Sequence, residues 1–176
     1  MTTQILIAGF GGQGVLFAGK FLAYKGLVQE KNVSWLPSYG PEMRGGTCNC
    51  SVILSDTPVG SPIITNPDVL VAMNLPSLQK FEGTVAPGGV IIVDSTLIEA
   101  KVERTDVKVI YVPATQMAKD AGFATLANMI LTGKVLQASG CADFAGNKET
   151  LESFIPAKKA NLIDINCKAL QLGYDF

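Results

Sequence analysis

The stretch Gln4-Ile5-Leu6-Ile7-Ala8, followed by Gly9-Phe10-Gly11-Gly12-Gln13-Gly14, decides the fold. A short apolar run leads into a cluster of glycines, and a helix-like sequence continues from about 13 to 29. This order is typical of a buried strand, a tight turn and a helix. Because glycine tolerates a sharp turn, the chain can pass directly from strand to helix. The stretch therefore predicts the first strand and helix of an α/β sheet.

Further strands and helices alternate along the rest of the chain. Continuous apolar runs at 68–73 and 90–94 are typical of strands buried on both faces of a parallel sheet. We therefore predict a three-layer, mostly parallel Rossmann-like sheet with helices on both faces, formed by a single domain over residues 1–176. The other expected strands are 32–36, 47–54 and 108–112, the expected helices are 76–82, 115–120, 125–138, 149–154 and 157–172, and 37–46 is expected to be a loop.

Composition excludes several classes of protein. Apolar residues make up 48% of the chain and charged residues 16%, and this apolar excess indicates that some surface meets a partner. No run reaches the roughly 20 apolar residues of a membrane span, and the first residues lack a signal-peptide pattern. The net charge is −1, without a block of Lys or Arg that would indicate nucleic-acid binding. We expect a cytoplasmic protein that binds neither membrane nor nucleic acid.

The chain has no histidine and four cysteines. An imidazole-based catalytic triad is therefore excluded. Cys48 and Cys50 would point to the same face of a strand, which favours buried thiols over a metal site. We assign no catalytic residue and no metal ligand to this chain.

The glycine cluster has the spacing G-x-G-x-x-G, in the position that a dinucleotide fingerprint occupies. The acid that would hold a ribose belongs at the end of the second strand, where Leu36, Pro37 and Ser38 stand, and Glu30 falls before that strand. This pattern disfavours NAD or FAD, and leaves another phosphate or anion contact and a purely structural turn as alternatives. The candidate binding residues of this cluster are Gly9, Gly11, Gly12, Gln13 and Gly14.

The first helix is apolar on more than one side. Phe17, Phe21, Tyr24 and Val28 form a stripe at helical spacing, in addition to the stripe that would cover the sheet. Either the rest of the domain covers this second stripe, or it is a subunit interface. On the second interpretation we expect the isolated chain to form a homodimer.

A second glycine-rich stretch combines a phenol, a carboxylate and a guanidinium. Arg44 offers a planar donor fork suited to a carboxylate or phosphate, and Glu42 could orient it. The alternative is a surface loop with a weak ion pair. The candidate binding residues of this stretch are Tyr39, Gly40, Pro41, Glu42, Arg44, Gly45 and Gly46.

Together, Gly-Phe-Gly-Gly-Gln-Gly-Val at 9–15 and Tyr-Gly-Pro-Glu-Met-Arg-Gly-Gly-Thr at 39–47 resemble the gamma subunit of 2-oxoacid:ferredoxin oxidoreductases. Shorter pieces, such as Asn74-Leu75-Pro76-Ser77-Leu78 and Asn128-Met129, fit the same family. The stretch Trp35-Leu36-Pro37-Ser38-Tyr39, which leads into the second glycine-rich loop, is most similar to the 2-oxoglutarate and 2-oxoisovalerate types.

The resemblance implies a multi-subunit enzyme that oxidatively decarboxylates a 2-oxoacid, with 2-oxoglutarate as the first candidate, to an acyl-CoA, carbon dioxide and reduced ferredoxin. It implies that the alpha and beta subunits hold thiamine diphosphate and Mg²⁺, and that the iron–sulfur clusters lie on the beta and ferredoxin-like delta parts. It also implies that coenzyme A is a co-substrate. This chain would hold no cofactor alone and would be inactive in isolation. The rival interpretation is a stand-alone Rossmann-like nucleotide-binding or scaffold protein without catalysis.

Overall fold

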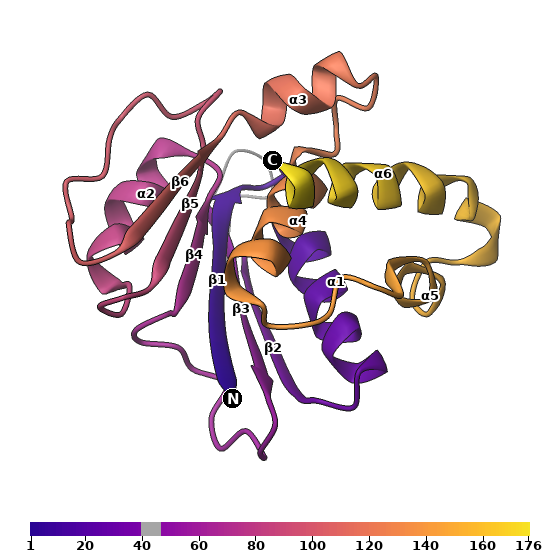
Figure 1. The fold of residues 1–176 in the computed structure, drawn as a ribbon, viewed down its shortest axis with the longest axis horizontal. Helices are drawn as coiled ribbons and strands as arrows, with labels where there is room; N and C mark the ends of the chain where they lie inside the picture. The colour runs from indigo at the N-terminus through magenta and orange to yellow at the C-terminus, as the bar shows by residue number, and fades with distance from the viewer. Residues whose placement is uncertain (40–46) are drawn as a thin grey trace.

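The computed structural model describes residues 1–39 and 47–176, in which a six-stranded sheet lies between helices (Figure 1). In chain order the elements are β1 (Thr2–Phe10), α1 (Val15–Val28), β2 (Asn32–Tyr39), β3 (Thr47–Ser55), β4 (Val69–Ala72), α2 (Leu75–Phe81), the 3-10 turn η1 (Glu82–Thr84), β5 (Val90–Asp94), β6 (Lys108–Val112), α3 (Ala114–Asp120), α4 (Ala127–Ser139), α5 (Asn147–Glu152), the 3-10 turn η2 (Ala157–Lys159) and α6 (Asn161–Asp175).

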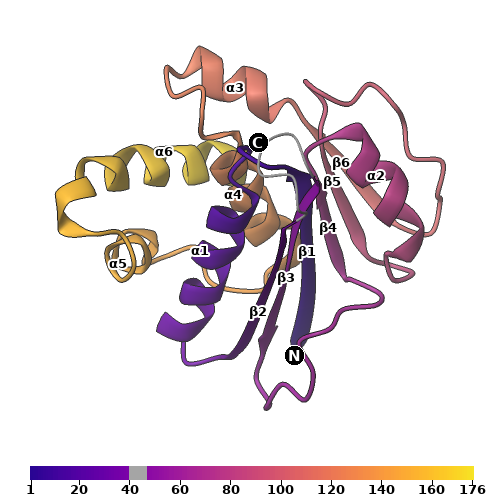
Figure 2. The ribbon, with the colours of Figure 1, turned by 180° about the vertical axis from the view of Figure 1, so that it is seen from behind.

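The strands lie in the order β2-β3-β1-β4-β5-β6. β1, β4, β5 and β6 pair in parallel, whereas β3 pairs antiparallel with both β1 and β2. Five strands therefore point in one direction and β3 alone is reversed. Figures 1 and 2 show α2 on one face of the sheet and α1 and α4 on the other. The predicted mostly parallel sheet with helices on both faces is confirmed.

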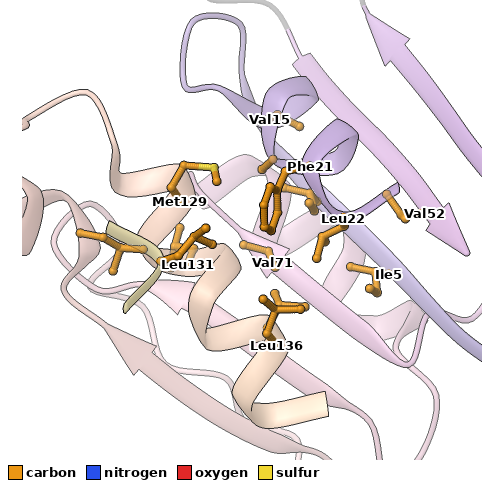
Figure 3. Packing of buried hydrophobic residues seen from close by; sticks show 14 of the residues in the cluster. Ile5, Val15, Phe21, Leu22, Val52, Val71, Met129, Leu131 and Leu136 are labelled. Carbon is orange, nitrogen blue, oxygen red and sulfur yellow. The ribbon is translucent and has the colours of Figure 1, made fainter. Parts of the chain in front are cut away.

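The larger core lies between the sheet and the helices α1 and α4. Alternate residues of β1, Ile5 and Ile7, point toward this side and lie in register with Val69 and Val71 of β4. Phe21 and Leu22 of α1 pack over them, as do Met129, Leu131 and Leu136 of α4 (Figure 3). This core fixes the start of α1 against the carboxyl end of β1.

A smaller core covers the opposite face of the sheet. Leu6 of β1, with Leu70 and Ala72 of β4, packs against Leu78 of α2. Because α1 follows β1 and α2 follows β4, successive helices leave the adjacent strands β1 and β4 on opposite faces. The carboxyl ends of these two strands are therefore the topological switch point, where open α/β sheets bind their ligands.

Two glycines let α4 and α6 approach each other closely. A Cβ atom at Gly173 would overlap the Ile130 carbonyl oxygen, and one at Gly133 would overlap that of Leu170. Each helix thus presents a glycine to the backbone of the other. This packing holds α6 against α4.

The second apolar stripe of α1 is covered within the chain. Phe21 is fully buried, and the rings of Phe17 and Tyr24 lie 5.5 and 5.0 Å from the ring of Phe154. Only Val28, at the end of the helix, is exposed among these stripe residues. The domain itself supplies the cover, and the interpretation of this stripe as a subunit interface is not supported.

The largest differences from the expected boundaries are at β2 and α6. Residues 37–39 belong to β2 and not to a loop, because β2 is an edge strand and an edge tolerates the missing N–H of Pro37. The helix expected over 157–172 begins with the separate turn η2, and α6 then runs on to Asp175. Short 3-10 turns are common at helix ends, and helical spacing alone does not distinguish them.

Candidate functional site

The glycine cluster forms the turn from β1 to α1 at the switch point. Gly12 and Gly14 have φ angles of 95° and 77°, a left-handed conformation that side chains disfavour. Gln13 N donates to Phe10 O over 3.2 Å and closes the turn. The left-handed backbone conformation therefore accounts for glycine at positions 12 and 14.

The Gln13 side chain crosses the switch point itself. Its Oε1 accepts a hydrogen bond of 2.6 Å from Phe10 N, and its Nε2 donates one of 2.9 Å to Met73 O, beyond β4. A Cβ atom at Gly9 would lie 2.5 Å from Gln13 Oε1, so Gly9 makes room for this amide. The Gln13 carboxamide thus links the carboxyl ends of β1 and β4, where the pyrophosphate of a dinucleotide would approach.

Glu30 lies far from the glycine cluster. It follows the last turn of α1 with a φ of 58°, and Lys31 N donates to Gly26 O over 2.9 Å to end the helix. The 14-residue α1 is about 20 Å long at 1.5 Å per residue. Glu30 therefore lies near the amino ends of the parallel strands, whereas the glycine cluster lies at their carboxyl ends. It cannot hold the ribose of a nucleotide bound at the glycine cluster.

Helix α1 begins at Val15 without a side-chain cap among the residues that the structure describes. Gly14 is the N-cap and has no side chain to accept from the first N–H groups. The helix dipole adds about half a positive charge at this end. Backbone donors and dipole together favour an anion at the start of α1.

A cavity of about 280 Å³ opens beside this helix end. It joins the glycine cluster to Tyr39, the last residue of β2, because Tyr39 lies in register with Cys48 on the side of the sheet that α1 covers. Gly12, Gly14 and Tyr39 are the predicted binding residues that share this cavity. Its lining residues are Gly12, Gly14, Val15, Leu16, Phe17, Tyr39 and Cys48. The predicted residues Gly40, Pro41, Glu42, Arg44, Gly45 and Gly46 lie outside the described residues.

Asn128 is a residue of this region that the sequence reasoning did not select for the site. It lies in the first turn of α4, and its Nδ2 donates to Gly14 O over 3.1 Å. The sequence offers one signal for it, a carboxamide within an otherwise apolar helix start. The glycine cluster is therefore held from β4 through Gln13 and from α4 through Asn128.

The cysteines of β3 are buried thiols. Cys50 Sγ donates to Val15 O over 3.5 Å, and burial, reinforced by the neighbouring Cys48, raises the pKa of Cys50 to about 12. Burial also raises the pKa of Cys48. Within 1–39 and 47–176, no three Cys, Asp or Glu side chains come together as a metal site. The same ranges contain no helix both long and apolar enough to cross a membrane.

Comparisons with known proteins give the family. The family model for pyruvate ferredoxin/flavodoxin oxidoreductase matches residues 4–176. Subunit VorA of the ketoisovalerate oxidoreductase of Methanothermobacter thermautotrophicus is 42% identical over 98% of this chain, which spans only 36% of VorA. Subunit KorC of the 2-oxoglutarate synthase of Methanothermobacter marburgensis is 34% identical over 89% of this chain and 88% of its own length.

The fold agrees with a solved structure from the same group. The gamma subunit of a keto/oxoacid ferredoxin oxidoreductase from Geobacter sulfurreducens superposes with a TM-score of 0.84. It is 29% identical, and the match covers 99% of this chain and 95% of that one. With the family model matched over nearly all of its length, this chain belongs to the pyruvate ferredoxin/flavodoxin oxidoreductase family.

Proposed function

We propose that this chain is the gamma-type subunit of a multi-subunit 2-oxoacid:ferredoxin oxidoreductase. In this role it takes part in oxidising a 2-oxoacid with coenzyme A to an acyl-CoA and carbon dioxide. Ferredoxin accepts the electrons and is reduced. The observation that carries the proposal is the match to KorC, which covers 88% of KorC and 89% of this chain. VorA also supports it, because 98% of this chain matches a segment that makes up 36% of VorA. We therefore propose that partner subunits carry out the rest of the reaction.

Within the proposed complex, thiamine diphosphate, Mg²⁺ and the iron–sulfur clusters belong to the alpha, beta and delta subunits. Within the described residues the four thiols do not form a cluster site, because no three Cys, Asp or Glu side chains come together there. We also propose that residues 1–176 form a single domain and that the complex is cytoplasmic.

The part that we assign to this chain is contact with coenzyme A. Coenzyme A carries phosphate groups, and the uncapped start of α1 offers backbone donors beside a cavity that Tyr39 also lines. Glu42 and Arg44 follow Tyr39 by three and five positions in the sequence and supply the charged groups of the proposed contact. The chain thus contributes anion binding, and electron transfer belongs to its partners.

Exposed apolar side chains at the same edge of the molecule support contact with a partner. Phe10 ends β1, Leu75 begins α2 after β4, and Leu97 follows β5, and all three are exposed. The carboxyl ends of the parallel strands thus carry apolar surface around the proposed site. We propose that a partner subunit covers this edge.

Two substrates are candidates. 2-Oxoglutarate is favoured by the match over 88% of KorC, and 2-oxoisovalerate by the higher identity, 42%, with VorA. We place 2-oxoglutarate first, because the match covers 88% of KorC but only 36% of VorA.

Purification from the native cell tests the proposal. The tagged chain is expected to co-elute with partner subunits, and the complex to reduce ferredoxin with 2-oxoglutarate only when coenzyme A is present. Parallel assays with 2-oxoisovalerate and pyruvate rank the substrates. A monomer that elutes alone and binds NADH at micromolar concentration would instead support the rival stand-alone nucleotide-binding protein.

A further inference from the structure

Gly14 is the residue at which the glycine cluster, α1 and α4 meet. Its φ of 77° is left-handed, and it is the N-cap of α1. Its carbonyl oxygen accepts two hydrogen bonds, one of 3.0 Å from Ala18 N within α1 and one of 3.1 Å from Asn128 Nδ2 in α4. The orientation of this one peptide group sets the direction in which the first turn of α1 faces the cavity.

Asn128 is an unusual residue for its place. It is only 4% exposed, beside core residues such as Met129 and Ile130. Its Oδ1 is buried without a hydrogen-bond partner in the described part of the chain. Burying an unpaired carbonyl oxygen costs free energy, so an apolar side chain would serve packing alone better. The contribution that sets Asn128 apart is the hydrogen bond from its Nδ2 to Gly14.

The contact between Asn128 and Gly14 is also a steric one. A Cβ atom at Gly14 would overlap both Nδ2 and Cγ of Asn128. The Asn128 carboxamide therefore lies directly against the Gly14 backbone. Gly14 can neither gain a side chain nor move toward α4 without displacing Asn128.

We propose that Asn128 is a positioning residue that acts through Gly14. By holding the Gly14 carbonyl, it keeps Gly14 in the left-handed conformation from which α1 begins beside the cavity that Val15, Leu16 and Phe17 line. Asn128 itself lies outside the cavity lining, so it orders the anion site without touching the ligand.

Hydrogen exchange on the full chain tests this inference directly, with Asn166 as a matched control. Asn166 is 3% exposed in α6, its Oδ1 likewise lacks a partner in the described part, and its Nδ2 donates only within its own helix, to Leu162 O. In Asn128→Ala, the hydrogen-bonded amides of Phe10, Gln13 and Ala18 are expected to exchange about tenfold faster, the loss that one hydrogen bond can cause. In Asn166→Ala their exchange is expected to stay unchanged.

A second variant protects the test against a folding defect. Asn128→Ser keeps a polar group that is too short to reach Gly14 O, and is expected to give the same local acceleration. Exchange of these three amides that is equal in the Asn128 and Asn166 variants would overturn the inference.

Kinetics of the assembled complex add a functional measurement, which rests on the proposed function. Asn128→Ala is expected to raise the KM for coenzyme A by about three- to tenfold, with the KM for the 2-oxoacid unchanged. Faster exchange with an unchanged KM for coenzyme A would leave the positioning role intact and contradict the proposed coenzyme A contact. Unchanged exchange would refute the positioning role whatever the kinetics show.

Discussion

At the scale of single residues, glycine has three distinct functions in this chain. Gly12 and Gly14 adopt left-handed backbone conformations, whereas Gly9 makes room for the Gln13 carboxamide. Gly133 and Gly173 instead allow two helices to meet backbone to backbone. Substitution by alanine is therefore expected to have consequences that depend on position.

Gly173→Ala is expected to destabilise the fold strongly. The added methyl group would overlap Ile130 O, which is backbone and cannot move without shifting α4. We expect the free energy of unfolding, measured by urea denaturation, to fall by at least about 1–3 kcal/mol. Gly60→Ala is the control, because a Cβ there meets no atom within 4 Å. Equal stability of the two variants would contradict the close packing of α4 and α6.

Cys50 should respond to pH in a defined window. Burial raises the pKa of its thiol from 9.0 to about 12. The stability that the buried neutral thiol contributes to the folded protein is therefore fully present below pH 9 and is lost as the pH rises toward 12. We expect Cys50 to resist iodoacetamide in the native protein at pH 8 and to react after unfolding. In Cys50→Ala, the loss of stability above pH 9 should be smaller than in the parent chain. Rapid native labelling of Cys50 would contradict this burial.

At the scale of secondary structure, α1 binds the connection between α4 and α5. Gln29 exchanges two hydrogen bonds with the backbone of Asp143, of 3.0 and 2.9 Å. The buried Lys25 donates to the carbonyl oxygens of Phe144 and Ala145. Desolvation lowers the pKa of Lys25, and nearby carboxylates, chiefly Glu149, oppose that shift. A lysine of α1 and the glutamine at its C-cap thus position a segment more than a hundred residues later.

Lys25→Met is expected to loosen this connection. Methionine fills a similar volume but leaves the two carbonyl oxygens without their donor, at a cost of about 1–3 kcal/mol in the free energy of unfolding. Lys119→Met, at an exposed position of α3, is the control and is expected to change little. Thermal or urea denaturation measures both, and matching stabilities would show that Lys25 does not support this segment.

The sequence predicts most of the helices and strands, but not the full extent of every strand. The runs at 68–73 and 90–94 gave β4 and β5 because buried parallel strands are apolar throughout. The antiparallel pairing of β3 with β2 agrees with the sequence, because the seven residues between Tyr39 and Thr47 are too few for the crossover that parallel strands need. The extension of β2 through Pro37 could not be predicted, because it depends on β2 being an edge strand.

At the scale of the whole molecule, both cores depend on one sheet. Ile5 and Ile7 of β1 enter the larger core, and Leu6 between them enters the smaller one. Such alternation couples the two faces through the same strands. It supports the proposal that residues 1–176 form a single domain.

A single cooperative unfolding transition is therefore expected. Fluorescence of Trp35, the only tryptophan in the chain, reports on β2, and far-ultraviolet circular dichroism reports on the helices. The two denaturation curves should coincide, as they do for a two-state domain. Clearly separated midpoints would indicate two independent folding units.

The candidate site was predictable in part. The glycine cluster was recognisable from its position after β1, but its meeting with Tyr39 depends on β3 lying between β1 and β2. The anchoring roles of Gln13 and Asn128 required the structure, because Met73 and Gly14 lie sixty and more than a hundred residues from them. Sequence spacing carries no information about such distant contacts.

The central claim is that this chain is a subunit required for coenzyme A-dependent oxidation of a 2-oxoacid. Its most direct test is the rate of ferredoxin reduction by the partner subunits, assembled with and without this chain, as coenzyme A is varied. We predict coenzyme A-dependent reduction only in the complete assembly. The same rate and the same KM for coenzyme A without this chain would contradict the claim.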